Sequence, residues 1–312
     1  MFRELSMGIQ SASRSGMHPF LRSAGFTPLF ALVLCFSAKA ASLEPATVAA
    51  WDEYVRLATL SNGQRASSES GFLWVDEVPG RSARVREGEI AVAPTGRHSP
   101  TRVPDGLIHD WMGAVFIPGA NQEDVLRALR DYSRYKDWFQ PAVADSKLIE
   151  SNGKKDRFSM VLVNKSFFKD SALDMEYESC FTRLDERRGY SISRSTRVQE
   201  VKENGPNGKY LLPEGEGSGM VWRLMTITRY LERDGGVYIE LQAIGLSRDI
   251  PASLRWMVEP IVKHVLRASL TTSLRQTANA VLSNQAGKAP SVTESHFRGA
   301  SSRATDRVTP QR

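Results

Sequence analysis

A long amphipathic segment near the C-terminus constrains the fold of this chain more than any other feature. Over residues 251–283, apolar residues recur every three or four positions, the spacing that gathers them on one face of a helix. Pro251 suits the first turn of a helix, whereas Pro260 predicts a short first helix and then a kink or a restart. The apolar face is too long to be buried by anything smaller than a sheet. Its residues are Leu254, Val258, Ile261, Val262, Val265, Leu266, Leu270, Leu274, Ala278 and Val281.

The residues before this helix read mainly as extended segments. Residues 107–117 form the first predicted strand, and Asn121 is then a good N-cap for the first of two short helices. Apolar residues alternate with polar ones in several later runs, most clearly over residues 237–243, and pairs such as Asn152-Gly153 have the form of hairpin turns. This alternation predicts an antiparallel sheet with one face covered.

The order of these elements is strand, two short helices, about six strands and one long helix, which an antiparallel sheet curled around a single helix would fit. We therefore predict the α+β class and a helix-grip architecture, in which a curved antiparallel sheet wraps around the long C-terminal helix. Residues 106–284 make up this domain. A lead-in segment over residues 41–105 precedes it, with a helix at 43–60 and short extended pieces at 72–75 and 83–92.

The first 40 residues read as a secretory signal peptide. Arg22 precedes an apolar run over residues 26–38, and the Ala-Lys-Ala sequence at 38–40 is a small-x-small cleavage site. The run is too short to span a bilayer, which takes about 20 apolar residues. We therefore expect residues 1–40 to be removed and the mature protein to be exported, to a periplasmic or extracellular location.

The net charge of +6 does not indicate a nucleic-acid-binding protein. Residues 1–40 and residues 285–312 each carry +3, so the part between them is neutral overall. Since no lysine- or arginine-rich stripe remains to follow a phosphate backbone, we expect no nucleic-acid partner. Residues 285–312 are rich in Ser, Thr and Arg with almost no aliphatic residues, which predicts a disordered tail.

Residue types that carry catalysis or bind metals are sparse. After removal of the leader only Cys180 remains, which excludes an internal disulfide, and we expect its thiol to be a small buried side chain rather than a nucleophile. His98, His109, His264 and His296 have no partner at metal-binding spacing. We therefore predict no metal site and no cofactor.

Three closely spaced glycines, Gly215, Gly217 and Gly219, resemble a phosphate loop only superficially. They neither follow a strand and open a helix nor end in Gly-Lys-Ser/Thr, so they provide no cradle of backbone N–H groups at a helix N-terminus. We interpret them as a flexible loop between two strands and as a possible lid over a cavity.

Three stretches and the order of elements resemble the START-like superfamily, also called SRPBCC, in its secreted bacterial form similar to polyketide cyclases and lipid-transfer proteins. The likeness covers residues 106 to about 283, and the lead-in segment has no counterpart in a minimal domain of this type. The resemblance implies a cavity between the curved sheet and the long helix that holds an apolar or amphipathic ligand. The stretches are Trp111-Met-Gly-Ala-Val-Phe-Ile-Pro-Gly, Tyr132-Ser-Arg-Tyr-Lys-Asp-Trp-Phe-Gln-Pro141, and Gly235-Gly-Val-Tyr-Ile-Glu240 before Leu246-Ser-Arg-Asp-Ile-Pro251.

Such a cavity is lined mainly by apolar and aromatic side chains, and for each aromatic candidate a place in the filled core is the competing interpretation. Arg248 would orient a ligand carboxylate or phosphate, or instead Arg248 and Asp249 would make a structural bridge or cap at this junction. Arg194, Arg223 and Arg229 would be cavity residues only if they point inward. The predicted ligand-binding residues are Trp138, Phe139, Phe158, Met160, Tyr177, Phe181, Tyr190, Met225, Arg248, Trp256 and Ile261.

We therefore predict an exported protein that binds a lipid or another hydrophobic small molecule without chemistry of its own; a transient membrane contact and the oligomeric state stay open. The rival hypothesis is a cyclase or aromatase-type enzyme, in which His109, His264 or a buried Tyr or Arg acts in the same cavity. The third is a protein-interaction module. A buried histidine facing a roomy cavity would favour the enzyme, and a filled core with an exposed apolar patch the interaction module.

Overall fold

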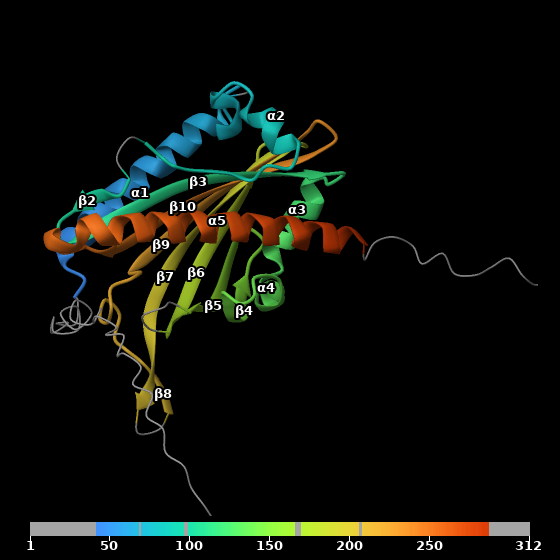
Figure 1. Cartoon of the computed structure of the whole chain (residues 1–312). Helices are drawn as coiled ribbons and strands as arrows, with labels where there is room; N and C mark the ends of the chain where they lie inside the picture. The colour runs from blue at the N-terminus through green and yellow to red at the C-terminus, as the bar shows by residue number, and fades with distance from the viewer. Residues whose placement is uncertain (1–41, 69, 97–98, 166–169, 206–207, 287–312) are drawn as a thin grey trace, which may run out of the picture. The chain divides into compact units, whose positions relative to one another are not determined.

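The computed structural model describes residues 42–68, 70–96, 99–165, 170–205 and 208–286 (Figure 1). All of them belong to one compact unit, Ala40–Arg312. The predicted signal peptide and nearly all of the predicted tail lie outside the described residues.

The lead-in and the helices of the main domain alternate with strands along the chain. The lead-in comprises α1 (Pro45–Ala66), the 3-10 helix η1 (Trp74–Glu77), α2 (Arg81–Arg86), β1 (Ala91–Pro94) and β2 (Thr101–Val103). The later helices are α3 (Gln122–Arg130), η2 (Tyr132–Arg134), α4 (Tyr135–Trp138), η3 (Ala252–Leu254) and α5 (Arg255–Ala286). The remaining strands are β3 (Gly106–Pro118), β4 (Val143–Ser151), β5 (Lys155–Lys165), β6 (Asp170–Arg183), β7 (Arg188–Gly205), β8 (Gly208–Leu211), β9 (Arg223–Arg233) and β10 (Gly236–Arg248).

The described strands form one antiparallel sheet of ten strands. Its order is β1-β3-β10-β9-β7-β6-β5-β4, with β2 also paired to β3 and β8 to β7. The pairing of β3 with β10 runs from Gly236 opposite Pro118 to Arg248 opposite Gly106. Together with the single long helix α5, this curved sheet confirms the predicted α+β helix-grip fold.

Helix α5 lies across one side of the sheet, here called the helix side (Figure 1). The helix packs tightly on Gly113 of β3, where an added Cβ would stand 2.5 Å from Leu274 Cδ1 and 3.2 Å from Leu270 Cγ. Only a residue without a side chain lets the helix come this close. Because side chains alternate across a strand, the odd-numbered residues of β3 therefore face α5.

The opposite side of the sheet, here called the lead-in side, is covered by the N-terminal segment. Trp51 and Val55 of α1 pack in a buried cluster with Met225 of β9 and Ile244 of β10. Phe72 and its neighbours Leu73 and Val75 pack in a second buried cluster, with Ala114 of β3 and Tyr238 of β10. The central strands of the sheet thus have α5 on one side and the lead-in on the other.

The lead-in differs from its prediction in one respect. The helix at residues 43–60 is confirmed, but the extended pieces predicted at 72–75 and 83–92 are mostly helical turns, and only β1 is a strand. Gly80 begins α2 with a φ of 78°, and the Arg81 guanidinium lies 3.7 Å from the Trp74 ring. The apolar spacing that suggested strands serves instead to bury η1 and α2 against the sheet.

The restart predicted at Pro260 is wrong, because α5 runs as one helix from Arg255 to Ala286 with Pro260 inside it. The residue lies near the start of the helix, where its missing N–H leaves only the Trp256 carbonyl without its helical donor. Trp256 is 79% exposed. Water can therefore satisfy that carbonyl, and the helix continues.

The predicted N-cap of α3 is confirmed. The Asn121 side chain accepts a hydrogen bond of 3.0 Å from the Asp124 backbone N–H, and the Asp124 carboxylate accepts one of 3.4 Å from the Asn121 N–H. This capping box satisfies two of the amide groups that a helix leaves unpaired at its start.

Candidate functional site

A row of cross-strand neighbours crosses the helix side of the sheet. Each member lies opposite the next in the strand register, except that Leu224 and Ser195 are joined by a 2.9 Å hydrogen bond from the Leu224 backbone N–H to the Ser195 hydroxyl. The row thus has an imidazole at one end, small or aliphatic side chains in its centre and aromatic rings at the other end. Its members, from β3 to β5, are His109, Gly245, Leu224, Ser195, Tyr177 and Phe158.

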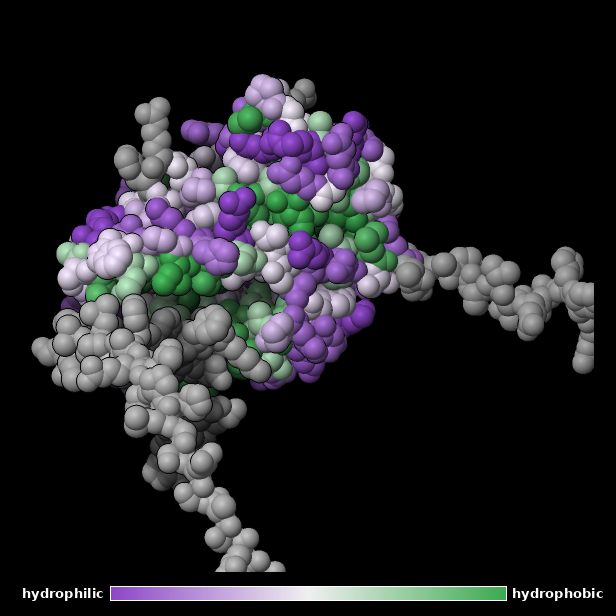
Figure 2. All heavy atoms as spheres, viewed as in Figure 1, coloured by the Kyte–Doolittle hydropathy of each residue, from purple (hydrophilic) through white to green (hydrophobic). Residues whose placement is uncertain are grey.

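The centre of this row is only partly buried, although α5 covers the same side of the sheet. Gly245, Leu224 and Ser195 are all of intermediate exposure. An added Cβ on Gly245 would contact only Leu224 Cδ1, at 3.6 Å, in contrast to the closed position at Gly113. Figure 2 shows hydrophobic residues gathered in the recess below the ridge of α5. The helix side is therefore filled beneath the C-terminal half of α5 and open beside Gly245.

The aromatic end of the row is packed. Phe158 stacks between Tyr132 and Tyr177, with ring centroids 4.2 Å and 5.0 Å apart, and both Phe158 and Tyr177 are almost completely buried. Met160 and Phe181 pack against this cluster but are only partly buried. Of the predicted lining residues, Phe158 and Tyr177 thus form the floor of the helix side, whereas Met160 and Phe181 remain partly accessible.

Two further candidates lie where the short helices meet α5. Trp138 packs against the buried cluster that contains Leu270 and Leu274, and its indole Nε1 is buried without a hydrogen-bond partner among the described residues. Phe139 lies edge-on to Tyr135, with ring centroids 5.1 Å apart. Both therefore serve the packing between α4 and its neighbours.

His109 forms the polar end of the row. Its Nε2 lies 3.1 Å from the Ser247 hydroxyl, and the residue is only 9% exposed. Burial lowers the pKa of His109 to about 4, although the negative charge of Glu259 on α5 opposes this shift. The imidazole is therefore neutral near pH 7, so it can donate one hydrogen bond and accept another.

Other predicted residues point to the lead-in side. Met225 packs with Trp51 of α1, and Tyr190 lies opposite Arg229, whose guanidinium contacts Glu240 at 3.2 Å beneath the lead-in. Arg223 and Arg194 lie on this side too, and Arg194 donates to the Thr59 hydroxyl of α1 at 2.7 Å. None of these side chains, Tyr190, Met225, Arg194, Arg223 and Arg229, faces α5.

Arg248 and Asp249 have structural partners. Arg248 donates to the Ser218 carbonyl at 3.4 Å, and Asp249 accepts a 2.8 Å hydrogen bond from Arg255 at the start of α5. Asp249 also lies 3.5 Å from Arg102 of β2. These contacts support the structural-bridge interpretation of this junction over a ligand-orienting role.

The glycine loop before β9 is held in place. The Ser218 backbone N–H donates to the buried Glu200 carboxylate at 2.5 Å, and the Gly219 carbonyl accepts from the Arg248 N–H at 2.8 Å. Although burial alone would raise it, the pKa of Glu200 is lowered by hydrogen bonds from Lys202 and Ser218. The sequence predicted a flexible loop, but in the structure hydrogen bonds to Glu200 of β7 and Arg248 of β10 hold this loop in place.

The last two candidates lie on the surface of α5. Trp256 is 79% exposed and Ile261 is 49% exposed. Ile261 precedes Leu270 by roughly two and a half helical turns and so points away from the sheet. Ile261 therefore does not face the row of residues that begins at His109.

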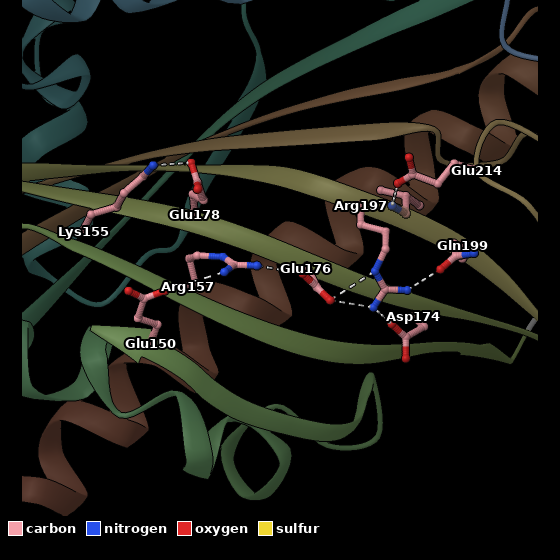
Figure 3. Close-up of polar contacts among 10 residues, drawn as sticks. Glu150, Lys155, Arg157, Asp174, Glu176, Glu178, Arg197, Gln199 and Glu214 are labelled. Carbon is pink, nitrogen blue, oxygen red and sulfur yellow. Dashed lines mark hydrogen bonds and ion pairs between the residues drawn. The ribbon is translucent and has the colours of Figure 1, made fainter. Parts of the chain in front are cut away.

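A separate hollow of about 470 Å³ lies on the outer strands β4–β7, on the side away from α5 (Figure 3). Arg197 contacts Asp174 at 2.6 Å and Glu176 at 3.0 Å there, and Lys155 contacts Glu178 at 2.7 Å. Such a ladder of ion pairs does not suit an apolar ligand. The hollow is lined by Lys147, Leu148, Ile149, Ser159, Asp174, Glu176 and Arg197.

The remaining reactive residues suggest no further site. Cys180 is exposed, so the expectation of a buried thiol is wrong. His264 is exposed on α5. Over the described ranges, His, Cys, Asp and Glu side chains form no group of three or more that could hold a metal ion. Within the same part of the chain, no helix is both long and apolar enough to cross a membrane.

Sequence reasoning missed the pairing of His109 with Ser247. It considered His109 as a catalytic base and the Ser247-Arg248-Asp249 stretch for its arginine, but it did not join the two. The pairing of β3 with β10 brings them together, because Ser247 lies two residues from Gly245, the cross-strand neighbour of His109.

No protein-family model and no curated protein matches the chain. Solved structures do. The STAR-related lipid transfer protein from Xanthomonas axonopodis is 18% identical, with a TM-score of 0.36, over 62% of this chain and 97% of that one. The Zhui aromatase/cyclase from Streptomyces sp. R1128 is 12% identical, with a TM-score of 0.36, over 56% and 94%. Human STARD10 is 14% identical, with a TM-score of 0.39, over 72% and 86%.

These likenesses concern the fold alone. The helix-grip architecture that the sequence predicts is established by the strand order and α5 themselves. The structures that resemble this chain include both lipid-transfer proteins and aromatase/cyclases.

Proposed function

We propose that this protein binds a lipid or another hydrophobic small molecule between the helix side of the sheet and α5, and that it does no chemistry on it. The observation that carries the proposal is the partly exposed centre of the row, at Gly245, Leu224 and Ser195, between a packed aromatic end and a buried histidine. A filled core would have large side chains at these positions. Apolar walls with a few polar groups are typical of small-molecule sites.

The test is native mass spectrometry with lipid extraction on the protein purified from the secreted fraction. We expect a co-purifying apolar ligand in the natural protein and its loss in Gly245→Leu, whose side chain fills the open space. Gly63→Leu is the matched control, because an added Cβ on this exposed glycine of α1 has no neighbour within 4 Å. An apo mass, together with no uptake from a lipid panel, would remove the proposal.

An enzyme of the cyclase or aromatase type is the second candidate, and buried His109 on the helix side is the observation that favours it. We rank it second because a pKa of about 4 makes His109 a weak general base near pH 7. Incubation with aromatic polyketide substrates, followed by product analysis, distinguishes the two. Turnover that disappears in His109→Phe would move the enzyme ahead of the carrier.

We also propose that the protein is exported. The support is the sequence of residues 1–40 alone, with its apolar run and its small-x-small site. Thiol counting provides a test, since the full chain contains Cys35 and Cys180 whereas a processed chain retains only the second. One thiol per molecule and an N-terminus at Ala41 are expected; two thiols in the protein recovered outside the cell would contradict processing at this site.

A further inference from the structure

The hydrogen bond between His109 and Ser247 has no role in the proposed function as stated so far. The Ser247 hydroxyl has one proton, and it donates to the Arg248 carbonyl at 3.2 Å. Its lone pairs are then available to His109 Nε2, 3.1 Å away. When the hydroxyl donates in this way, the proton of the neutral imidazole lies on Nε2 and Nδ1 is left as a bare acceptor.

Nδ1 of His109 has no hydrogen-bond partner among the described residues, while the residue is more than nine-tenths buried. Its cross-strand neighbour is Gly245, where the lack of a side chain leaves open space. Directly opposed residues of an antiparallel pair hold their Cβ atoms about 5 Å apart. A ligand atom above Gly245 is thus within reach of the imidazole.

The charges around His109 disfavour an anion. Glu259 of α5 is close enough to act on the imidazole electrostatically. Arg102 contacts Glu259 at 3.1 Å and also lies 3.5 Å from Asp249. The positive charge of Arg102 is therefore already paired. A carboxylate or phosphate placed at Nδ1 would meet a lone pair and a negative charge, whereas a hydroxyl would donate its proton to the lone pair.

The rest of the row suits the body of such a ligand. From β3 to β5 it extends about 24 Å, taking 4.8 Å for each strand spacing. It passes from His109 over Gly245 and Leu224 to the aromatic floor at Phe158. This length and this polarity fit an amphipathic molecule with one polar end.

We infer that the bound ligand is a neutral, hydroxyl-bearing lipid, such as a long-chain or polycyclic alcohol, whose hydroxyl donates a hydrogen bond to His109 Nδ1 while its apolar body lies over Gly245 and Leu224. The inference rests on the proposed function and adds the chemical class of the ligand. The neutrality of His109 across the physiological pH range supports it.

The test uses 1-dodecanol, dodecyl methyl ether and dodecanoate as probes in calorimetric titrations of the full chain. One hydrogen bond predicts that the natural protein binds the alcohol about 3- to 10-fold more tightly than the ether. Dodecanoate is expected to bind most weakly. His109→Phe keeps an aromatic side chain but lacks the acceptor, so it should bind the alcohol and the ether equally. Its affinity for the ether should differ from that of the natural protein by less than about twofold, which is smaller than the effect of losing one hydrogen bond.

His264→Phe is the matched control, because His264 is exposed on α5 and should leave the preference for the alcohol intact. Nitrogen NMR of labelled protein gives a second measurement: a protonated Nε2 and an unprotonated Nδ1 that shifts on addition of dodecanol are expected. Equal binding of alcohol and ether to the natural protein, preferential binding of dodecanoate, or a protonated Nδ1 would overturn the inference while leaving the proposed function standing. Failure of all three probes and of a lipid panel to bind would instead remove the proposed function.

Discussion

Arg229 and Glu240 form an ion pair of 3.2 Å that is almost completely buried between the sheet and the lead-in. Glu240 also accepts a 2.8 Å hydrogen bond from the Val75 N–H of η1, and Arg229 donates to Asn62 of α1 at 3.1 Å. Burial raises the pKa of Glu240, while the charge of Arg229 opposes that rise. Because both partners from outside the sheet belong to the lead-in, the lead-in is an integral layer of this domain.

Removing one member of this pair is expected to destabilise the protein strongly. Arg229→Met or Glu240→Gln leaves a buried group without its partner, which costs about 3–5 kcal/mol of unfolding free energy. The double variant Arg229→Met/Glu240→Met removes both and should recover much of that loss. Urea unfolding measures these values. Arg56→Ala, which breaks an exposed ion pair with Glu53, is the control and should leave the free energy of unfolding nearly unchanged. A loss of similar size in the single and double variants would contradict the argument.

Two glycines of the helix side should respond in opposite directions to alanine. Gly113→Ala places a methyl group against Leu274 and Leu270, which should cost about 1–3 kcal/mol through overpacking. Gly245→Ala meets only Leu224 at ordinary contact distance and reduces the freedom of the unfolded chain, so we expect a change between zero and a gain of about 1 kcal/mol. Thermal and urea unfolding distinguish them. Equal destabilisation would mean that the space at Gly245 is already filled.

Stability should fall with acid in a way that depends on His109. Its folded pKa of about 4 lies below the ordinary value of 6.5, so between these pH values the unfolded chain binds a proton that the native protein does not. The stabilisation that the neutral His109 provides is therefore complete above pH 6.5 and is lost as the pH falls towards 4. Between pH 7 and pH 5 this effect lowers the free energy of unfolding by about 2 kcal/mol.

The measurement is urea unfolding of the natural protein and of His109→Phe across this pH range. Other groups, such as Asp110, whose pKa is raised by burial, titrate in both proteins and cancel in the difference. The difference between the two proteins should shrink as the pH falls from 7 to 5. A constant difference would show that His109 takes up its proton equally in the folded and unfolded chains.

The features that the sequence predicts correctly are local or periodic. The alternation at residues 237–243 and the N-cap at Asn121 each depend on neighbours within a few positions. The side on which a strand residue lies is harder to predict here, because α5 covers one side of the sheet and the lead-in covers the other. In β7 the serines Ser191, Ser193 and Ser195 face α5 and the apolar Tyr190 and Ile192 face the lead-in, so the apolar face of a strand does not mark the side of the predicted cavity.

The polar end of the site could not be assembled from local patterns. His109 and Ser247 are 138 positions apart, and their contact depends on the register between β3 and β10. A shift of one residue in that register would place each on the opposite side of the sheet from the other. Register is set by packing over the whole sheet, so the sequence predicted His109 as a candidate without predicting that it meets Ser247.

The loop before β9, which contains Gly215, Gly217 and Gly219, should depend on glycine at position 217. Gly217 has a φ of 118°, and an added Cβ would collide with the Glu200 carboxylate that holds the Ser218 N–H. Gly217→Ala should therefore combine backbone strain with loss of the anchor. Gly153→Ala is the matched control, since Gly153 has a φ of 84° but no neighbour within 4 Å of an added Cβ.

We expect Gly153→Ala to cost about 1 kcal/mol from backbone strain alone and Gly217→Ala to cost at least twice as much. Limited proteolysis and hydrogen exchange should show faster cleavage and exchange at residues 212–221 only in Gly217→Ala. Glu200→Gln, which removes the carboxylate charge but not its bulk, should produce the same local effect more weakly. Equal behaviour of the two alanine variants would mean that Glu200 does not hold the loop, and the loop could then open as a lid over the helix side.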